Sequence, residues 1–157
     1  MLPSAATSKT AVAVELLDRA IELYLREDSF FAALHLAGAA EEFLNVYART
    51  APELQGSPLV PAFDSFKEAV VLLSAPASKK ESDETEKWVY DHMTYAKNSV
   101  KHMRGGKDTK VEFNAKEEAY DTIDRAITTY FQLMSVLRLP HLPSIGLFDK
   151  RRRSESA

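Results

Sequence analysis

Apolar residues recur at steps of three and four along most of the chain, which is the spacing that places them on one side of an α-helix. The first such segment spans residues 10–26 and the second spans residues 30–49, with the polar break Glu27-Asp28-Ser29 between them. The second segment is rich in alanine and leucine and almost apolar all round near its start. That pattern is typical of a helix at the centre of a bundle.

Three more helices are predicted in the rest of the chain, each bounded by proline, glycine or capping residues. One follows the proline-rich loop that ends near Pro61, and the next spans residues 83–103, opened by the capping pair Asp83 and Glu86. The last spans residues 115–137 and is opened by Asn114. The stripe of the third predicted helix consists of Phe63, Phe66, Val70 and Leu73. No strand is predicted.

This pattern predicts an all-α protein, an antiparallel up-and-down bundle of four to five helices. With 157 residues, the chain is long enough for one domain with a core of its own. We expect the bundle to occupy residues 10–140, after a flexible N-terminus over 1–9. Residues 141–157 end in a run of charged and small residues and are expected to be a disordered tail.

Composition excludes several classes of function. The chain has no cysteine, which rules out a disulfide framework, a thiol nucleophile and a cysteine metal site. Its five glycines form none of the common phosphate-binding loops. The net charge of -3 gives no general attraction to nucleic acid, so only a local basic patch could supply it. No stretch approaches the length of a membrane span and no leader is evident, so we expect a cytoplasmic protein without membrane contact.

Histidine is scarce, and its spacing argues against a metal centre. None of the four histidines is preceded three positions earlier by a carboxylate, and no HExxH motif occurs. We therefore expect no metal and no cofactor. His35 and Glu42 share a helix face, either as a structural hydrogen-bonded pair or as a contact to a metal or nucleotide. The adjacent carboxylates Glu41 and Glu42 are interpreted as cap or surface charges.

The helix predicted over residues 83–103 has two distinct faces. Its apolar face is made of residues that step by four and three: Val89, Met93, Ala96, Val100 and Met103. At about 100° per residue, Asn98 and His102 point away from that face. Asp91 and Tyr95 extend the same outer ridge. An ordinary surface face is rich in Glu and Lys, whereas this ridge carries an aromatic ring, an amide and an imidazole.

A basic cluster lies beside this ridge in a chain that is otherwise acidic. Its members are Lys97, Lys101, His102, Arg104, Lys107 and Lys110. Two interpretations remain open. The cluster could hold a phosphate through charge-assisted hydrogen bonds. It could instead be the set of cations that stabilises the C-terminal end of a helix. The run Arg151-Arg152-Arg153 is likewise either an RNA or partner contact or a solvated tail.

The segment Lys97-Asn98-Ser99-Val100-Lys101-His102 resembles the signature of HEPN domains, which are all-helical and associated with nucleic acid. In that signature an arginine is followed by a polar residue, and four to six residues separate the arginine from a histidine. Asn98 matches the polar position and His102 the histidine, while Lys97 stands in place of the arginine. The alanine-rich segment 32–42, which ends in Glu41-Glu42, is similar to the helix that precedes the HEPN motif.

The resemblance implies a homodimer of helical bundles whose two motifs face each other. Active HEPN domains are metal-independent endoribonucleases, in which the histidine handles a 2′-hydroxyl proton and the basic residue holds the phosphate. His102, Asn98 and Lys97 would then be the catalytic residues, and Lys101, Arg104 and Lys107 would bind phosphate. Other members are non-catalytic modules that bind nucleotides or partners, including antitoxins and nucleotidyltransferases. Tyr95, Asp91, His35 and Glu42 are secondary candidates for the site.

Two functions therefore remain open at this stage. The first is an RNA-directed protein, either a ribonuclease or a weakened descendant that still binds RNA or nucleotide. The second is a non-catalytic dimeric interaction module in which the ridge is a polar seam. An enzyme requires an accessible His102 with Lys97 or Arg104 within reach of the same phosphate. A seam would bury His102 against its counterpart.

Overall fold

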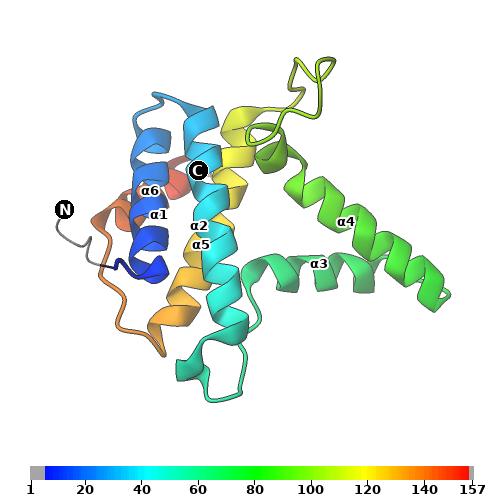
Figure 1. Cartoon of the computed structure of the whole chain (residues 1–157), viewed down its shortest axis with the longest axis horizontal. Helices are drawn as coiled ribbons and strands as arrows, with labels where there is room; N and C mark the ends of the chain where they lie inside the picture. The colour runs from blue at the N-terminus through cyan, green and yellow to red at the C-terminus, as the bar shows by residue number, and fades with distance from the viewer. Residues whose placement is uncertain (1–5, 156–157) are drawn as a thin grey trace.

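The computed structural model describes residues 6–155, which form six α-helices and one 3-10 turn and no strand (Figure 1). The all-α bundle is confirmed, with one helix more than the four to five expected. The elements in chain order are α1 Lys9–Leu25, α2 Phe30–Thr50, η1 Pro52–Leu54, α3 Ala62–Leu73, α4 Lys79–Ser99, α5 Ala115–Met134 and α6 Pro143–Glu155.

The core is built by α1, α2 and α5, and α2 packs along both of the others. Ala33, Ala37 and Ala40 of α2 are fully buried, and their small side chains let neighbouring helices approach closely. Larger core side chains surround them, among them Leu17 of α1 and Tyr130 of α5. The central place predicted for the alanine-rich helix is therefore confirmed.

Capping side chains define where most of these helices begin. Ser29 accepts a hydrogen bond from the backbone N–H of Ala32 at 3.3 Å, and Asn114 caps α5 through the N–H groups of Lys116 and Glu117. The cap at Asn114 was predicted, and Ser29 belongs to the polar break predicted between the first two helices. The start predicted at Asp83 is wrong because Ser78 already caps α4, accepting from the N–H of Glu81 at 3.2 Å.

The ends of α4 and α5 also differ from the prediction. The apolar repeat predicted that α4 would continue to Met103, but the helix ends at Ser99. Met103 is exposed, so no buried apolar contact stabilises another helical turn there. Similarly, α5 ends at Met134, three residues before its predicted end at Leu137.

Two helices leave the core and form an arm, visible in Figure 1 as α3 and α4 extending to one side. Phe63 of α3 packs against Val89 and Met93 of α4 in a second, smaller apolar cluster. The helices are tied by an ion pair between Lys67 and Glu86 at 2.6 Å. The predicted stripe on α3 is only partly a core face, because Phe66 and Leu73 are exposed.

The C-terminal segment forms a helix where we expected disorder. In α6, Ile145 and Phe148 lie one turn apart and are both buried against the core. The hydroxyl of Ser144 donates to Asp18 at 2.5 Å, which ties the start of α6 to α1. The charged composition of this segment led to the prediction of disorder, but burial of its two apolar side chains stabilises the helix.

The expected flexible N-terminus falls mainly on residues 1–5, which lie outside the described residues, and Lys9 already belongs to α1. Within residues 6–155, none of the helices combines the length and apolar character that crossing a bilayer requires.

Candidate functional site

Lys97 is buried in an ion-pair network with α2 and α5. Its Nζ atom donates to Oε2 of Glu41 at 3.0 Å, and Nε of Arg125 donates to Oε1 of the same carboxylate at 2.7 Å. Glu41 is 0% exposed and Lys97 is 6% exposed. Two cations therefore share one carboxylate inside the bundle, leaving the network with one net positive charge. Glu41 is not the cap or surface charge expected from the sequence.

The surroundings of this network are fitted to the lysine side chain. A Cβ atom added at Gly38 of α2 would lie 3.2 Å from Cβ of Lys97 and 3.3 Å from its Cδ, so glycine leaves the room that the lysine uses. The Nζ atom of Lys97 also lies 5.3 Å from the centre of the Phe63 ring, and the guanidinium of Arg125 lies 5.9 Å from it. The aromatic face adds favourable electrostatics to both cations.

A pocket of about 300 Å³ opens beside the network, between α2 and α4. Lys97 and Asn98 line it together with Asn45, Arg49 and Tyr90. Asn45 is buried, and its Oδ1 atom has no hydrogen-bond partner among the described residues. The guanidinium of Arg49 is engaged by Asp64 through two bonds of 2.8 and 2.7 Å.

His102 does not share this pocket with Lys97. It lies beyond the end of α4, in the exposed turn, where its backbone N–H donates to the carbonyl of Asn98 at 2.9 Å. It lines a different, shallow hollow of about 540 Å³, together with Lys101, Asp108 and Lys110. The predicted catalytic residues Lys97, Asn98 and His102 therefore do not share one site. The reason is that α4 ends before His102, so the histidine is not on the helical ridge.

The connection between α4 and α5, residues 100–114, carries exposed cations, and we call it the basic loop. At the start of this loop, Lys101 pairs with Glu42, and its Nζ atom lies 3.0 and 3.2 Å from the two carboxylate oxygens. Arg104, Lys107 and Lys110 are exposed, and no ion pair of theirs is found among the described residues. Asp108 and Glu112 are the acidic residues of the loop. Three positively charged side chains therefore face solvent within seven residues.

Three aromatic rings meet at the foot of the basic loop, and we call them the aromatic cluster. Phe113 contacts Phe31 of α2 at 6.1 Å between ring centres and Tyr95 of α4 at 6.2 Å, both edge to face. Phe31 and Tyr95 are each 48% exposed. A ring that leaves half its surface in water offers a face for stacking.

The secondary candidates lie around this surface without forming a metal site. His35 is exposed on α2 one turn after Phe31, and Asp91 is exposed on α4 one turn before Tyr95. Asp91 pairs with Lys87, and His92 stacks on Trp88 at 5.2 Å between ring centres. Glu42 is held by Lys101 rather than by His35. Residues 6–155 contain no group of three or more His, Cys, Asp or Glu that could hold a metal ion.

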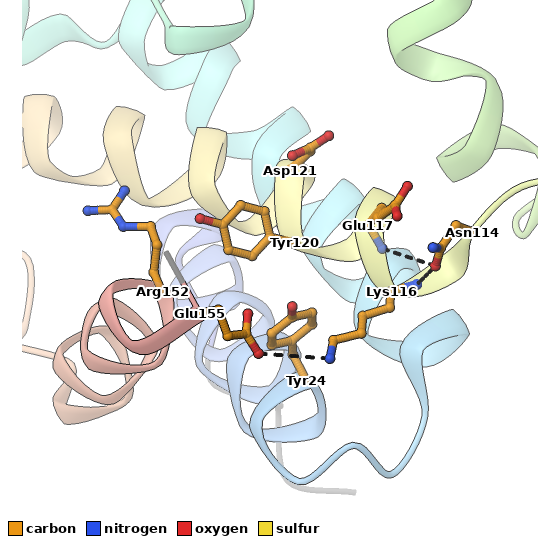
Figure 2. Close-up of a pocket in the computed structure, with 8 residues that line it drawn as sticks. All are labelled: Tyr24, Asn114, Lys116, Glu117, Tyr120, Asp121, Arg152 and Glu155. Carbon is orange, nitrogen blue, oxygen red and sulfur yellow. Dashed lines mark hydrogen bonds and ion pairs between the residues drawn. The ribbon is translucent and has the colours of Figure 1, made fainter. Parts of the chain in front are cut away.

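A separate pocket of about 530 Å³ lies between α1, α5 and α6 and contains none of the predicted site residues (Figure 2). The rings of Tyr24 and Tyr120 line it, and the charged ends of Lys116 and Glu155 pair across it at 3.9 Å. Burial raises the pKa of Tyr24 to about 12 and raises the pKa of Tyr120. Both rings also contact Phe148, so the pocket follows from the way α6 docks.

Sequence reasoning missed four residues that shape these surfaces: Glu41, Arg125, Phe31 and Phe113. A signal for Glu41 was available, because it stands at a three- and four-residue step among the apolar positions Leu34, Ala37 and Leu44 of α2. The meeting of Phe31 with Phe113 is a contact between residues far apart in the chain, and no local pattern encodes it.

Comparison of the chain with protein-family models, with curated proteins and with solved structures finds no match.

Proposed function

We propose that this chain is an RNA-directed, HEPN-like module that binds single-stranded RNA without cutting it. The aromatic cluster stacks bases, and the basic loop holds the phosphates that join them. The observation that carries this proposal is the adjacency of the two: half-exposed rings meet at the foot of a loop with three solvent-facing cations.

The two features together match the physics of single-strand binding. Stacking on an aromatic side chain contributes roughly 1–3 kcal/mol per base and tolerates any base. Cations beside the rings attract the backbone and release counterions from it. Because the chain carries a net charge of -3, this attraction is local to the loop, which suits a short segment of RNA better than a long duplex.

Binding without cleavage is favoured by the engagement of Lys97. A catalytic cation must approach the scissile phosphate, yet Lys97 is buried and donates to Glu41. Freeing its charge would break its ion pair with the buried Glu41 carboxylate and pull its side chain out of the space beside Gly38. Arg104 is exposed near His102 but lies on a loop rather than a rigid element, and precise catalytic geometry is better held by helices.

Fluorescence anisotropy with a labelled single-stranded RNA of mixed sequence tests the binding surface. The triple variant Arg104→Gln, Lys107→Gln, Lys110→Gln is compared with wild type over a range of salt concentrations. We expect weaker binding and a slope of log K against log salt that is shallower by about 2, since each lost phosphate contact removes roughly 0.7. Tyr95→Ala should weaken binding while leaving the salt slope unchanged.

The matched control is the triple variant Arg26→Gln, Lys150→Gln, Arg153→Gln. It removes the same charge from three exposed positions away from the basic loop. We expect its affinity and salt slope to stay close to those of wild type. If the control lost as much affinity as the loop variant, binding would be a matter of overall charge or of the C-terminal helix, and the proposed surface would be wrong.

Cleavage is tested separately on the same RNA, in the presence of a chelator, with wild type and His102→Ala. We expect the RNA to stay intact with both proteins. Wild-type cleavage that disappears in His102→Ala would overturn the non-catalytic part of the proposal and would make the chain a metal-independent ribonuclease. In that case Lys97→Arg should be at least as active as wild type.

A further inference from the structure

The pocket between α1, α5 and α6, which we call the tyrosine pocket after Tyr24 and Tyr120, contains an unused hydrogen-bonding group. Tyr24 is 3% exposed, and its hydroxyl makes no hydrogen bond with another described residue. The hydroxyl is not one of the fully enclosed polar atoms, so it is reached from the pocket, and in Figure 2 it points into the space between Tyr120, Lys116 and Glu155. Buried tyrosine hydroxyls usually have a partner, and here only water or a ligand can supply one.

Carboxylates without a cation line the same pocket. Glu117 and Asp121 stand one turn apart on α5, and neither makes an ion pair with another described residue. Burial raises the pKa of Asp121, and the nearby charges of Asp124 and Glu117 raise it further. Glu155 lines the opposite side of the pocket from α6. The pocket therefore holds negative charge that the protein itself does not neutralise.

The two cations of the lining are already paired with carboxylates. The Nζ atom of Lys116 lies 3.4 Å from an oxygen of Glu27 and 3.9 Å from an oxygen of Glu155. The guanidinium of Arg152 pairs with Asp124 at 3.1 Å. An anion in the pocket would have to compete for both cations and would be repelled by the unpaired carboxylates of α5. The electrostatics therefore favour a positively charged ligand.

We propose that the tyrosine pocket binds an aliphatic polyamine. One ammonium group pairs with Glu117 and Asp121, and a second donates to the hydroxyl oxygen of Tyr24 and to Glu155. The methylene groups between them lie against the ring of Tyr120. Carboxylates on two helices fit a ligand with more than one charge, and a volume of about 530 Å³ suits a flexible chain better than a bare ion.

A polyamine in this position would connect α5 to α6, and this gives its binding a structural effect. A ligand that binds only the folded state stabilises that state, and here the gain falls on the docking of α6. The pocket shares only Asn114 with the basic loop. The inference therefore does not depend on RNA binding, and it is tested without RNA because polyamines also bind RNA phosphates.

Isothermal titration calorimetry with spermidine at about 0.15 M salt measures the binding. We expect one saturable site per chain and an affinity at least about tenfold lower in the double variant Glu117→Gln, Asp121→Asn. The matched control is Glu68→Gln, Asp83→Asn, which removes the same charge from exposed positions on the arm and should bind like wild type. Equal losses in the two variants, or no saturable binding up to about 10 mM spermidine, would overturn the proposal.

The variant Tyr24→Phe tests the hydroxyl separately from the fold. Because this hydroxyl has no partner within the protein, its removal should leave the unfolding temperature at or above that of wild type. Spermidine affinity should fall by about threefold to tenfold, the usual effect of one net hydrogen bond. The exposed residue Tyr95 supplies the control, since Tyr95→Phe should keep the wild-type affinity. A folded Tyr24→Phe protein with unchanged affinity contradicts the proposed placement.

Hydrogen exchange locates the bound amine. Saturating spermidine should slow exchange in residues 143–155 and 115–122 and leave residues 79–99 unchanged. Slowing confined to other segments would overturn the proposal.

Inorganic phosphate and Mg²⁺ test the class of ligand. Neither should show saturable binding at the concentration at which spermidine saturates the protein. Phosphate binding that Arg152→Gln abolishes would make the pocket an anion site. Binding of Mg²⁺ that Glu117→Gln, Asp121→Asn abolishes would make it a site for an inorganic cation. Either result would contradict the polyamine assignment.

Discussion

Glu41 and Glu42 are neighbours in the chain and lie in opposite environments. The carboxylate of Glu41 is enclosed by the bundle and held by Lys97 and Arg125, whereas that of Glu42 faces solvent and meets Lys101. Moving a charge from water into the interior is costly, and the partners offset that cost only while both are in place. The energetic weight of the two residues should therefore differ greatly.

We predict that Glu41→Gln lowers the free energy of unfolding by about 3 kcal/mol, because it leaves Lys97 and Arg125 as uncompensated cations. Glu42→Gln should cost less than about 1 kcal/mol, as removal of an exposed ion pair does. Urea unfolding of the two variants and of wild type measures the difference. Equal losses in both variants would contradict the buried network.

Tyr130 gives the molecule a dependence on alkaline pH. Burial raises its pKa to about 12, and its hydroxyl donates to the carbonyl of Pro140. The folded state therefore holds this proton more tightly than the unfolded chain, in which the pKa is near 10. The stability from the neutral ring is complete below pH 10 and is lost as the pH rises towards 12.

We predict that Tyr130→Phe flattens the fall of stability between pH 10 and pH 12 and also costs about 1 kcal/mol at neutral pH through the lost hydrogen bond. Urea unfolding at several pH values measures both effects. The exposed residue Tyr95 supplies the control, since Tyr95→Phe should keep the wild-type profile. An unchanged profile in Tyr130→Phe would show that other groups govern the alkaline transition.

Single residues were the part of the site that the sequence predicted least well. The pattern correctly marked Val89, Met93 and Ala96 as buried on α4. It also placed Lys97 in the basic cluster beside the outer ridge, whereas this lysine is buried, as lysines are only when paired. The partner that buries Lys97 is Glu41, which lies 56 positions earlier. A periodicity within one helix carries no information about such a contact.

At the scale of elements, α6 shows how two apolar side chains can fix a charged segment. Ile145 and Phe148 are buried, and ion pairs from Arg151 to Glu27 and from Arg152 to Asp124 hold the helix to the α1–α2 turn and to α5. The pairs are exposed and each contributes little. Burial of the apolar side chains is therefore the main term that docks α6.

We predict that Phe148→Ala destabilises the protein by about 3–5 kcal/mol, the usual cost of emptying the place of a buried phenylalanine. The adjacent variant Leu147→Ala, at an exposed position, should cost less than about 1 kcal/mol. Thermal and urea unfolding of the pair measure the contrast. A Phe148→Ala variant as stable as Leu147→Ala would mean that α6 does not dock on the core.

The elements with strong periodicity were predicted well, and their boundaries less so. The helices over α1, α2 and α5 follow from long amphipathic repeats with capping residues at their starts. The error at the start of α4 came from two competing capping pairs, of which Ser78 with Glu81 is the one used. The missed helix α6 is short and has few apolar positions, so its stability depends on the surface that receives it.

At the scale of the whole molecule, the arm and the core differ in how they are held. The core helices bury a shared apolar interior, whereas α3 is anchored by Phe63, partly by Val70, and by two ion pairs. Regions with few buried apolar contacts open at lower free energy than the core. The arm should therefore open without the rest of the bundle unfolding.

We predict that amide hydrogens of residues 66–85 exchange well before those of residues 119–133. Hydrogen exchange followed by mass spectrometry measures both segments in one sample. Equal protection of the arm and of α5 would show that the molecule opens as a single cooperative unit.

The position of the arm in the chain has a consequence for the order of folding. α1 and α2 are joined by a short turn, while the arm and the basic loop separate α2 from α5. Closing the long loop costs entropy before any contact between α2 and α5 is gained, whereas the α1–α2 hairpin closes locally. The hairpin is therefore the natural nucleus, and its pairing with α5 is the slow step. During synthesis on a ribosome, the α1–α2 hairpin would therefore form first and would pack with α5 and α6 only after they emerge.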